Sequence, residues 1–368
     1  MQSDYVVIGG GVVGLAIAWG LLKRGCQVTI IDGDDGSFRA SRGNFGLVWV
    51  QSKGLKQPLY AKWNQNSAKA WGDFAAELKD STGFDVALEQ NGGYDLHFSE
   101  ATLQKQVEKY QILKAQLGGD YPFEVLDHAQ LLTEEPSIGS SVVGAILHHQ
   151  DGHVNPLKLL KALVDDVKRM GGRLLVGKSV VDVEHNKDFV VKCVDGTQVH
   201  SQKVLLCAGL GAMSLGPKLG FIAPIRPQRG QILVTEKLPK FINRPSLIAR
   251  QVEDGGVQIG VSNEEVGFDD NVTVDGISAI ASVAVKAHPA LSKAQLVRTW
   301  GALRVMSKDG LPIYQQSKTM PGAYLLTCHS GVTLAAAHAR FLPAWLENDP
   351  LAPNLEIFSE DRFELSAD

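Results

Sequence analysis

Cysteine is scarce in this sequence, and the few cysteines form no motif. There are four in 368 residues, namely Cys26, Cys193, Cys207 and Cys328, and no two of them are spaced as a Cys-x-x-Cys pair. The spacing gives no sign of a disulfide framework, a zinc site or an iron–sulfur cluster. We therefore assign no metal ligands.

Long hydrophobic runs, excess charge and hydrolase signatures are also missing. No uninterrupted apolar stretch reaches the length of a membrane-spanning helix. The net charge of −4 at pH 7 indicates neither a nucleic-acid-binding surface nor a cationic membrane anchor. The motifs Gly-x-Ser-x-Gly and His-Glu-x-x-His, which mark common hydrolases, do not occur. We expect a cytoplasmic protein that binds no nucleic acid, has no transmembrane segment and approaches the inner membrane only through partners.

What the sequence does contain is enough apolar residues, 44%, to build two domains. Residues 5–8 predict a short buried strand that runs directly into a glycine-rich turn. Apolar residues then recur at helical spacing up to Arg24, where Gly25 is placed to end the helix. Residues 27–31 predict a second strand. A strand–turn–helix–strand unit of this kind opens a parallel, doubly wound sheet, so we predict an α/β fold of the Rossmann type.

The rest of the chain returns to this nucleotide-binding pattern twice. Helical spacing predicts helices over 60–80, 101–117, 156–170 and 275–288 and from Val332, and strand patterns occur at 92–98, four times within 172–208, and at 323–328. We therefore predict two interleaved domains. The nucleotide-binding domain would comprise residues 1–85, 150–222 and 298–368. A second, α+β domain on a mixed or antiparallel sheet would comprise 86–149 and 223–297.

The glycine-rich turn carries the first chemical signal. Gly9 permits the tight turn, Gly11 lets the backbone approach a pyrophosphate, and Gly14 lets the helix pack on the strand. The helix N-terminus offers free N–H groups to the phosphates. Asp32, about twenty residues after the central glycine, can accept hydrogen bonds from ribose hydroxyls and argues against a 2′-phosphate. A turn without ligand and a capping role for Asp32 are the competing interpretations, and the motif does not separate FAD from NAD.

Six further segments, taken in order, point to one family. They are residues 40–47 (ASRGNFGL), 151–156 (DGHVNP), 204–209 (VLLCAG), 226–231 (RPQRGQ), 300–312 (WGALRVMSKDGLP) and 328–333 (CHSGVT). With these segments the sequence resembles the D-amino-acid-oxidase-like flavoenzymes. That family includes glycine oxidase, sarcosine oxidase, hydrogen cyanide synthase, D-hydroxyproline dehydrogenase and the opine oxidases. The resemblance implies FAD as the cofactor, an FAD-binding domain in place of a general nucleotide domain, and a substrate-binding role for the second domain.

The resemblance also implies which residues contact FAD. The expected cofactor-binding residues are Gly9, Gly11, Val12, Val13, Gly14, Asp32, Gly33, Ser41, Arg42, Asn44, Phe45, Gly46, Leu47, Val180, Ala208, Gly209, Arg304, His329, Ser330, Gly331, Val332 and Thr333. Ser41 and Asn44 suit phosphate or ribityl oxygens, or else stabilise their own loop as Ser and Asx turns. Residues 329–331 precede the last predicted helix, so their N–H groups would face the flavin pyrimidine edge. His329 itself either takes part there or only fills a polar gap.

Arg304 is the expected substrate residue. Its place before Asp309-Gly310 is similar to that of the arginine that grips the substrate carboxylate in several members of the family. A guanidinium binds a carboxylate through two parallel hydrogen bonds and stays charged; the competing role is a structural ion pair. Gln258 is a weaker candidate. It stands where single-subunit sarcosine oxidases carry an oxygen-activating lysine, which favours a dehydrogenase over an oxidase.

The departures from the family refine the expected reaction. Residues 300–308 contain no cysteine that could attach the flavin, so FAD should be bound noncovalently. Residues 43–51 and 328–337 are most similar to opine oxidase β subunits and D-hydroxyproline dehydrogenases, where a second subunit with its own flavin and an iron–sulfur component receives the electrons. A cluster would have to lie on such a partner, because this chain lacks the ligand cysteines.

The expected function is FAD-dependent oxidation of the C–N bond of a small, carboxylate-bearing amino acid, such as an opine or D-hydroxyproline. Hydride moves from the α-carbon to flavin N5, water hydrolyses the imine, and we assign no acid or base. Two alternatives stay open. One is a self-sufficient amine oxidase that releases hydrogen peroxide, and the other is an FAD-containing scaffold or electron-transfer subunit without a substrate of its own.

Overall fold

The computed structural model describes residues 2–33 and 39–363, and its centre is an eight-stranded sheet. Five of the strands run parallel in the order β17 (Ala323–Thr327), β11 (Gln198–Leu206), β1 (Gln2–Ile8), β2 (Val28–Asp32), β8 (Arg173–Val176). Antiparallel strands extend it, namely β16 (Ile313–Gln316) beside β17, and β10 (Phe189–Cys193) with β9 (Val180–His185) beside β11. The predicted α/β fold with a parallel sheet is confirmed.

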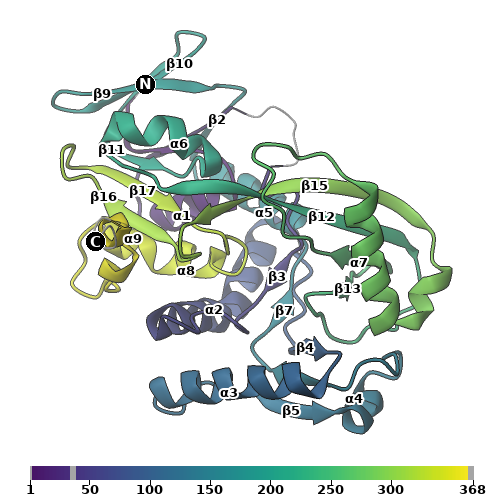
Figure 1. Cartoon of the computed structure of the whole chain (residues 1–368). Helices are drawn as coiled ribbons and strands as arrows, with labels where there is room; N and C mark the ends of the chain where they lie inside the picture. The colour runs from purple at the N-terminus through teal and green to yellow at the C-terminus, as the bar shows by residue number, and fades with distance from the viewer. Residues whose placement is uncertain (1, 34–38, 364–368) are drawn as a thin grey trace.

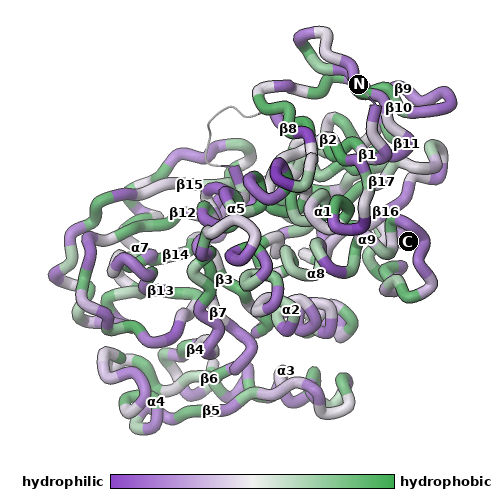
Figure 2. The backbone as a smooth tube through the Cα atoms, turned by 180° about the vertical axis from the view of Figure 1, so that it is seen from behind, coloured by the Kyte–Doolittle hydropathy of each residue, from purple (hydrophilic) through white to green (hydrophobic). Residues whose placement is uncertain are grey.

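Both faces of the parallel strands β17, β1 and β2 are largely buried, as expected of a sheet covered by crossover helices, whereas the outer strand β8 is partly exposed. Val7 and Ile30 enter one apolar core, whereas their chain neighbours Val6 and Ile31 enter the core on the opposite face. The first core is covered by helices α1 (Val12–Lys23), α2 (Pro58–Thr82), α5 (Pro156–Arg169), α8 (Ala335–Arg340) and α9 (Leu342–Leu346). In Figure 2, hydrophobic colour is concentrated where β1, β17 and α1 lie together.

Helix α1 directly follows the glycine-rich turn, and its apolar sequence explains why it lies in the core. Its residues from Val12 to Leu21 are almost all buried, because the helix lies between the sheet and helices α5 and α8. A helix that is apolar all round needs burial of this kind. It ends as predicted: Arg24 is its C-terminal capping residue and Gly25 follows with a φ of +84°.

A second sheet lies beside the first and is wholly antiparallel. Its order is β13 (Ala249–Gln251), β14 (Gly256–Gly260), β12 (Ile225–Lys237), β15 (Leu296–Ser307), and α7 (Val274–Ala287) packs on it. Figure 1 shows β12 and β15 running side by side from the parallel sheet towards α7. The predicted domain boundary at 297/298 falls within strand β15, which pairs with β12 on both sides of a register shift at Val297.

A third, smaller sheet completes the structure. Strands β4 (Gly93–His97), β6 (Gly144–His148) and β5 (Glu124–Asp127) form it, with α3 (Glu100–Gln116) and α4 (His128–Glu134) beside them. The short pair β3 (Leu47–Val48) and β7 (Gly152–His153) links this layer to the rest. The remaining short helices are α6 (Ala212–Leu215), η1 (Gly209–Gly211), η2 (Gly216–Leu219), η3 (Pro289–Lys293), η4 (Glu356–Phe358) and η5 (Glu360–Phe363).

The last predicted helix begins later than expected. Residues 331–334 form a turn in which the Leu334 N–H donates to the Ser330 carbonyl over 2.9 Å, and α8 starts only at Ala335. Because α8 has six residues and starts after this turn, the flavin-facing helix N-terminus expected at Val332 is wrong in position. Within the described part of the chain, no helix combines the length and apolarity needed to cross a membrane.

Candidate functional site

The carboxyl ends of four parallel strands bring the predicted segments together. Strand β1 ends at Ile8 before the glycine-rich turn, β2 ends in Asp32, β11 leads into Cys207, and β17 leads into Cys328. The register pairs Ile8 with both Ile31 and Leu206, so these ends lie at one edge of the sheet. Open α/β sheets bind their ligands at this edge.

The glycine-rich turn is fixed by hydrogen bonds to two of the predicted residues. The Gly10 N–H donates to Asp32 Oδ2 over 2.6 Å, and the Val12 N–H donates to Ser41 Oγ over 3.0 Å. Gly9 has a φ of +113°, and a side chain there would overlap the backbone of Cys207. A side chain at Gly14 would overlap the Gly9 carbonyl oxygen. The first and third glycines are thus required by turn geometry and close packing.

A cavity of about 570 Å³ opens in front of this turn. Most of the predicted cofactor residues line it: Gly9, Gly11, Val12, Val13, Asp32, Gly33, Ser41, Arg42, Asn44, Val180, Ala208, Gly209, His329 and Gly331. Gly14 and Gly46 do not line it, because Gly14 packs against the turn and Gly46 lies against Val154 and Arg250.

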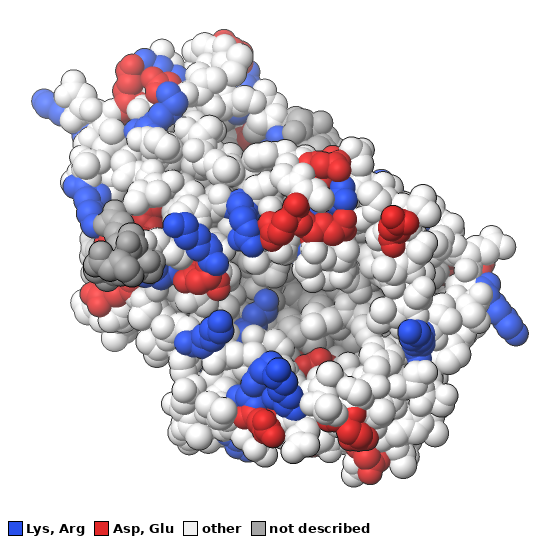
Figure 3. Space-filling model, viewed as in Figure 1, with Lys and Arg blue, Asp and Glu red and all other residues white. Residues whose placement is uncertain are grey.

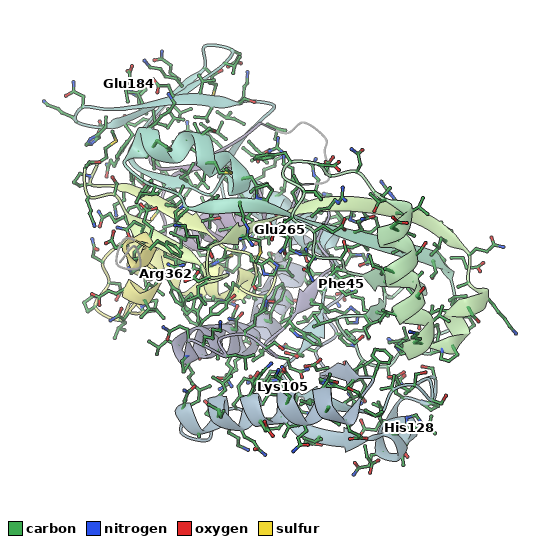
Figure 4. All side chains as sticks on the ribbon, in the orientation of Figure 1. Phe45, Lys105, His128, Glu184, Glu265 and Arg362 are labelled. Carbon is green, nitrogen blue, oxygen red and sulfur yellow. The ribbon has the colours of Figure 1, made fainter. Side chains whose placement is uncertain are left out.

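A larger cavity of about 1040 Å³ adjoins the first and extends under β12 and β15 towards α7. The other predicted residues line it: Phe45, Leu47, Arg304, Ser330, Val332 and Thr333. Six residues border both cavities: Ala40, Asn44, Leu303, Val305, Cys328 and His329. Figure 3 shows the surface hollowed above the α3 layer, with basic side chains on its margin. In Figure 4, Phe45 lies between the β12–β15 pair and that layer.

Arg304 enters the larger cavity from β15 and is held by main-chain oxygens. Nη1 donates to the Arg229 carbonyl over 3.2 Å, and Nη2 donates to the Ser262 carbonyl over 2.9 Å. None of the described acidic residues forms an ion pair with it, in contrast to Arg229, which Glu264 and Asp269 neutralise. The structural ion pair that competed as an explanation for Arg304 is therefore not formed with any described residue. Its positive charge is left facing the cavity.

Comparisons with known proteins agree with this geometry. The family model described as FAD dependent oxidoreductase (DAO) matches residues 4–345. An opine oxidase subunit of Rhizobium meliloti is 41% identical over 365 residues, which cover 99% of this chain and 98% of that protein. Hydrogen cyanide synthase subunit HcnC of Pseudomonas aeruginosa is 26% identical, covering 98% of this chain and 96% of the other.

The chain belongs to the FAD-dependent oxidoreductase family. The fold agrees as well: glycine oxidase from Geobacillus kaustophilus superposes with a TM-score of 0.90 at 23% identity, covering 97% of this chain and 98% of that one. FAD is the cofactor that the family uses, and the two joined cavities suit an elongated dinucleotide. The N-terminus of α1 faces the smaller cavity, and the absence of a side chain at Gly11, where a Cβ would contact Ser41 Oγ at 3.0 Å, leaves room for a pyrophosphate. The individual FAD contacts stay predictions.

Asn44 has the structural role that competed with cofactor binding, whereas the Ser41 hydroxyl binds the glycine-rich turn and not its own loop. Ser41 Oγ accepts from the Val12 N–H at the start of α1, and Asn44 Oδ1 accepts from the Gly46 N–H over 2.7 Å in an Asx turn. Both border the smaller cavity. The Ser41 hydroxyl hydrogen and the Asn44 amide group are not used in these bonds, so both residues keep groups that could contact a cofactor.

His329 and Cys328 border both cavities in the turn after β17. Burial, with the nearby charges of Lys53 and Arg304, lowers the pKa of His329 to about 3, so its imidazole is neutral at pH 7. Burial also raises the pKa of the Cys328 thiol to about 12. A protonated thiol is a poor nucleophile, which agrees with the expectation of noncovalent FAD.

Thr333 and Ser330 mainly tie the turn after β17 to other parts of the oxidoreductase. Thr333 Oγ1 donates to the Leu47 carbonyl over 3.2 Å and accepts from the Trp49 N–H, while its own carbonyl accepts from Trp71 Nε1 over 2.9 Å. Ser330 Oγ accepts from Tyr60 at 3.1 Å. These bonds fix the wall that separates α2 from the larger cavity.

Gln258 does not line the larger cavity. It lies on β14, where its Oε1 accepts from Nη2 of the buried Arg250 over 2.8 Å. The guanidinium of Arg250 also lies 5.8 Å from the ring centre of Phe45. A positive charge is therefore present beside the cavity although Gln258 is neutral, so Gln258 alone does not decide the electron acceptor.

The residue that sequence reasoning missed is Lys53. It lies in the turn between β3 and α2, it lines the larger cavity, and it lies within electrostatic range of Arg304 and Cys328. Lys53 belongs to no recognisable motif. The only signal in the sequence that could have indicated a site residue is a basic side chain a few residues after the segment 40–47. Among the described residues, no group of His, Cys, Asp or Glu is placed to hold a metal ion.

Proposed function

We propose that this chain is the catalytic, FAD-binding subunit of an enzyme that oxidises the C–N bond of a secondary or N-substituted amino acid. An opine or D-hydroxyproline is the kind of substrate meant, and the imine formed is hydrolysed by water. The observation that carries the proposal is Arg304, whose guanidinium has no acidic partner among the described residues and borders a cavity continuous with that of FAD. Such a guanidinium suits a substrate carboxylate.

The residues around the cavity would orient the substrate and exclude water. Arg304 would hold the carboxylate, so that the amine-bearing carbon faces the region shared by both cavities. FAD, when bound, supplies the oxidising power and accepts the hydride. Neutral His329 and the apolar walls formed by Phe45, Leu47 and Ile232 keep the region weakly solvated. No side chain is assigned as acid or base, because positioning and a dry electrostatic environment suffice.

The electrons would pass to a partner subunit. Two observations support this part: relatives at 41% and 40% identity are named as subunits, and the chain has no cysteine cluster for an iron–sulfur centre. The alternative, a self-sufficient oxidase that releases peroxide, is favoured by the positive charge of Arg250 and Lys53 near the cavity, because a cation there could stabilise reduced oxygen.

Flavin bleaching under anaerobic conditions tests the proposal. N-substituted amino acids should reduce the bound flavin, whereas simple amines without a carboxylate should not. Absence of bleaching with every amino acid would instead indicate a scaffold or electron-transfer subunit. Turnover of the purified chain with an artificial dye should exceed turnover with oxygen at least tenfold, and rapid peroxide release would contradict transfer to a partner.

A further inference from the structure

Two cationic side chains open into the larger cavity without an acidic partner. One is Arg304, described above. The other is Lys53: no described residue lies within ion-pair or hydrogen-bonding distance of its ammonium group, although the side chain is partly buried. Uncompensated cations in a low-dielectric cavity are unfavourable, which makes them a feature of sites that bind anions.

The turn that carries Lys53 is held from several sides. The Val50 N–H donates to Asp151 Oδ1 over 2.5 Å, and Gln51 Nε2 donates to the Gly93 carbonyl over 2.9 Å. Ser52 Oγ lies 2.9 Å from the Tyr110 hydroxyl, and the Lys53 N–H donates to the Val50 carbonyl over 3.2 Å. A lysine on such a fixed turn loses little further backbone freedom on binding, which favours a defined ligand contact over a solvated surface role.

The groups that face Lys53 leave its charge uncompensated. Arg304 from β15 repels it, and His329 and Cys328 from the turn after β17 are neutral near pH 7. Asp151 is fully buried, and burial raises the pKa of its carboxyl to about 8, so it is mostly protonated at pH 7. Burial and the charge of Arg304 lower the pKa of Lys53 to about 8, so the lysine is still largely charged there.

We propose that Lys53 binds a second carboxylate of the substrate, while Arg304 binds the first. The substrate class is then a secondary amine whose nitrogen joins two carboxylate-bearing arms, and Lys53 is the residue that selects it over a monocarboxylate such as N-methylglycine or a ring imino acid. This inference rests on the proposed function and narrows its substrate. A cavity of about 1040 Å³ has room for such a molecule beside a flavin ring.

Two inert ligands that differ by one carboxylate provide the test. Thiodiacetate and (methylthio)acetate carry a thioether in place of the amine, so neither offers a C–N bond for oxidation. Their dissociation constants are measured with the FAD-loaded full chain from the change in flavin absorbance. The intact protein should bind thiodiacetate at least about tenfold more tightly, since a charged hydrogen bond contributes about 1.5–3 kcal/mol, or roughly 10- to 100-fold.

Single-residue variants test whether Lys53 itself, and not the turn that carries it, binds the second carboxylate. Lys53→Met should weaken thiodiacetate about 10- to 100-fold and change (methylthio)acetate less than about twofold. Lys56→Met, an exposed lysine on the same connection, should change neither. Arg304→Lys should weaken both. Equal affinities of the intact protein for the two ligands, or an equal loss of both in Lys53→Met, would overturn the inference.

The pH dependence of thiodiacetate affinity distinguishes a ligand-binding lysine from a merely structural one. Thiodiacetate affinity of the intact protein should fall above about pH 8, where the Lys53 ammonium loses its proton. In Lys53→Met the fall in thiodiacetate affinity should be smaller. Asp151 titrates over the same pH range but is present in both proteins, so the difference between their pH profiles is due to Lys53. The same pH profile in both proteins would contradict the assignment.

Oxygen activation is the competing role for this lysine, and stopped-flow reoxidation of the photoreduced flavin distinguishes it. Lys53→Met should leave the rate with oxygen within about twofold. A large loss of that rate, with an unchanged preference between the two ligands, would assign Lys53 to oxygen. If no amino acid bleaches the flavin, the proposed function fails. If amino acids bleach it but Lys53→Met changes the affinities for both ligands by the same factor, or changes neither, only this inference fails.

Discussion

Arg304 depends on a single glycine on the neighbouring strand. A Cβ at Gly230 would lie 2.5 Å from Arg304 Nη2, so any other residue there would force the guanidinium to shift from this position. The carbonyls of Arg229 and Ser262 then fix its direction. Backbone acceptors position the cation without neutralising it, which is what an anion-binding arginine requires.

Exchange of Arg304 for lysine should raise the apparent KM for the amino-acid substrate at least about tenfold and leave FAD bound, because a lysine cannot form two parallel hydrogen bonds to a carboxylate. Steady-state kinetics with a dye acceptor and the flavin spectrum measure both effects. Arg226→Lys, an exposed arginine on β12 paired with Glu265, is the matched control and should change neither. An unchanged KM in the Arg304 variant would remove this residue from the site.

Individual residues differ in how well the sequence predicted them. Gly9, Gly14 and Asp32 lie in a motif whose spacing reflects backbone geometry, so their positions followed from the sequence. Ser41 and Asn44 were found, but their partners, the Val12 and Gly46 N–H groups, were not, because hydrogen bonds in a loop leave no periodic pattern. Lys53 was missed because what a side chain faces depends on segments that are distant in sequence.

At the scale of elements, the carboxyl edge of the parallel sheet organises the site. The strands and helices were predicted well where periodicity was long, as in α2, α3, α5 and α7. The start of α8 was wrong by three residues, since residues 331–334 form a turn that apolar spacing cannot tell from a helix. The pairing of β12 with β15, which places Arg304, joins segments about 70 residues apart and could not be read from local pattern.

Contact between the glycine-rich turn and α1 can be tested with two alanine variants. Gly14→Ala should weaken FAD binding at least about tenfold and destabilise the protein by about 1–3 kcal/mol, since its Cβ would displace the Gly9 carbonyl. Gly25→Ala, at the other end of α1 in open space with a φ of +84°, should cost about 1 kcal/mol and leave FAD affinity unchanged. Flavin-fluorescence titration and urea unfolding measure these values. Equal FAD affinities in the two variants would contradict this role for Gly14.

At the scale of the whole molecule, buried ionisable groups make stability depend on pH. Burial lowers the pKa of His148 and His288 to about 4, so stability due to them rises with pH up to about 6.5. Burial raises the pKa of Asp151 to about 8, so the folded state holds a proton that the unfolded chain has released, and stability due to Asp151 falls as pH rises towards 8.

Asp151→Asn should therefore remove a decline in stability that runs from about pH 4 to about pH 8, which abolishes the fall between pH 6.5 and 8 and makes the rise below pH 6.5 steeper. The amide keeps the Oδ1 acceptor for the Val50 N–H. Thermal unfolding of both proteins at pH 6.5 and 8 measures the effect, and an identical decline in the two proteins would show that Asp151 is not protonated in the folded state. His288→Gln, which changes a buried group remote from the cavity, should affect only the acidic side.

The wall shared by the two cavities should make FAD binding and substrate binding thermodynamically dependent on each other. Residues such as Asn44, Leu303 and His329 border both spaces, so a flavin in place would complete the enclosure in which an amino acid is held. The cofactor-free chain should then bind substrate analogues weakly, and an analogue should lower the dissociation constant of FAD by the same factor by which FAD lowers that of the analogue. FAD binding and substrate binding then form one coupled equilibrium. The substrate-bound chain would hold its flavin more tightly than the substrate-free chain.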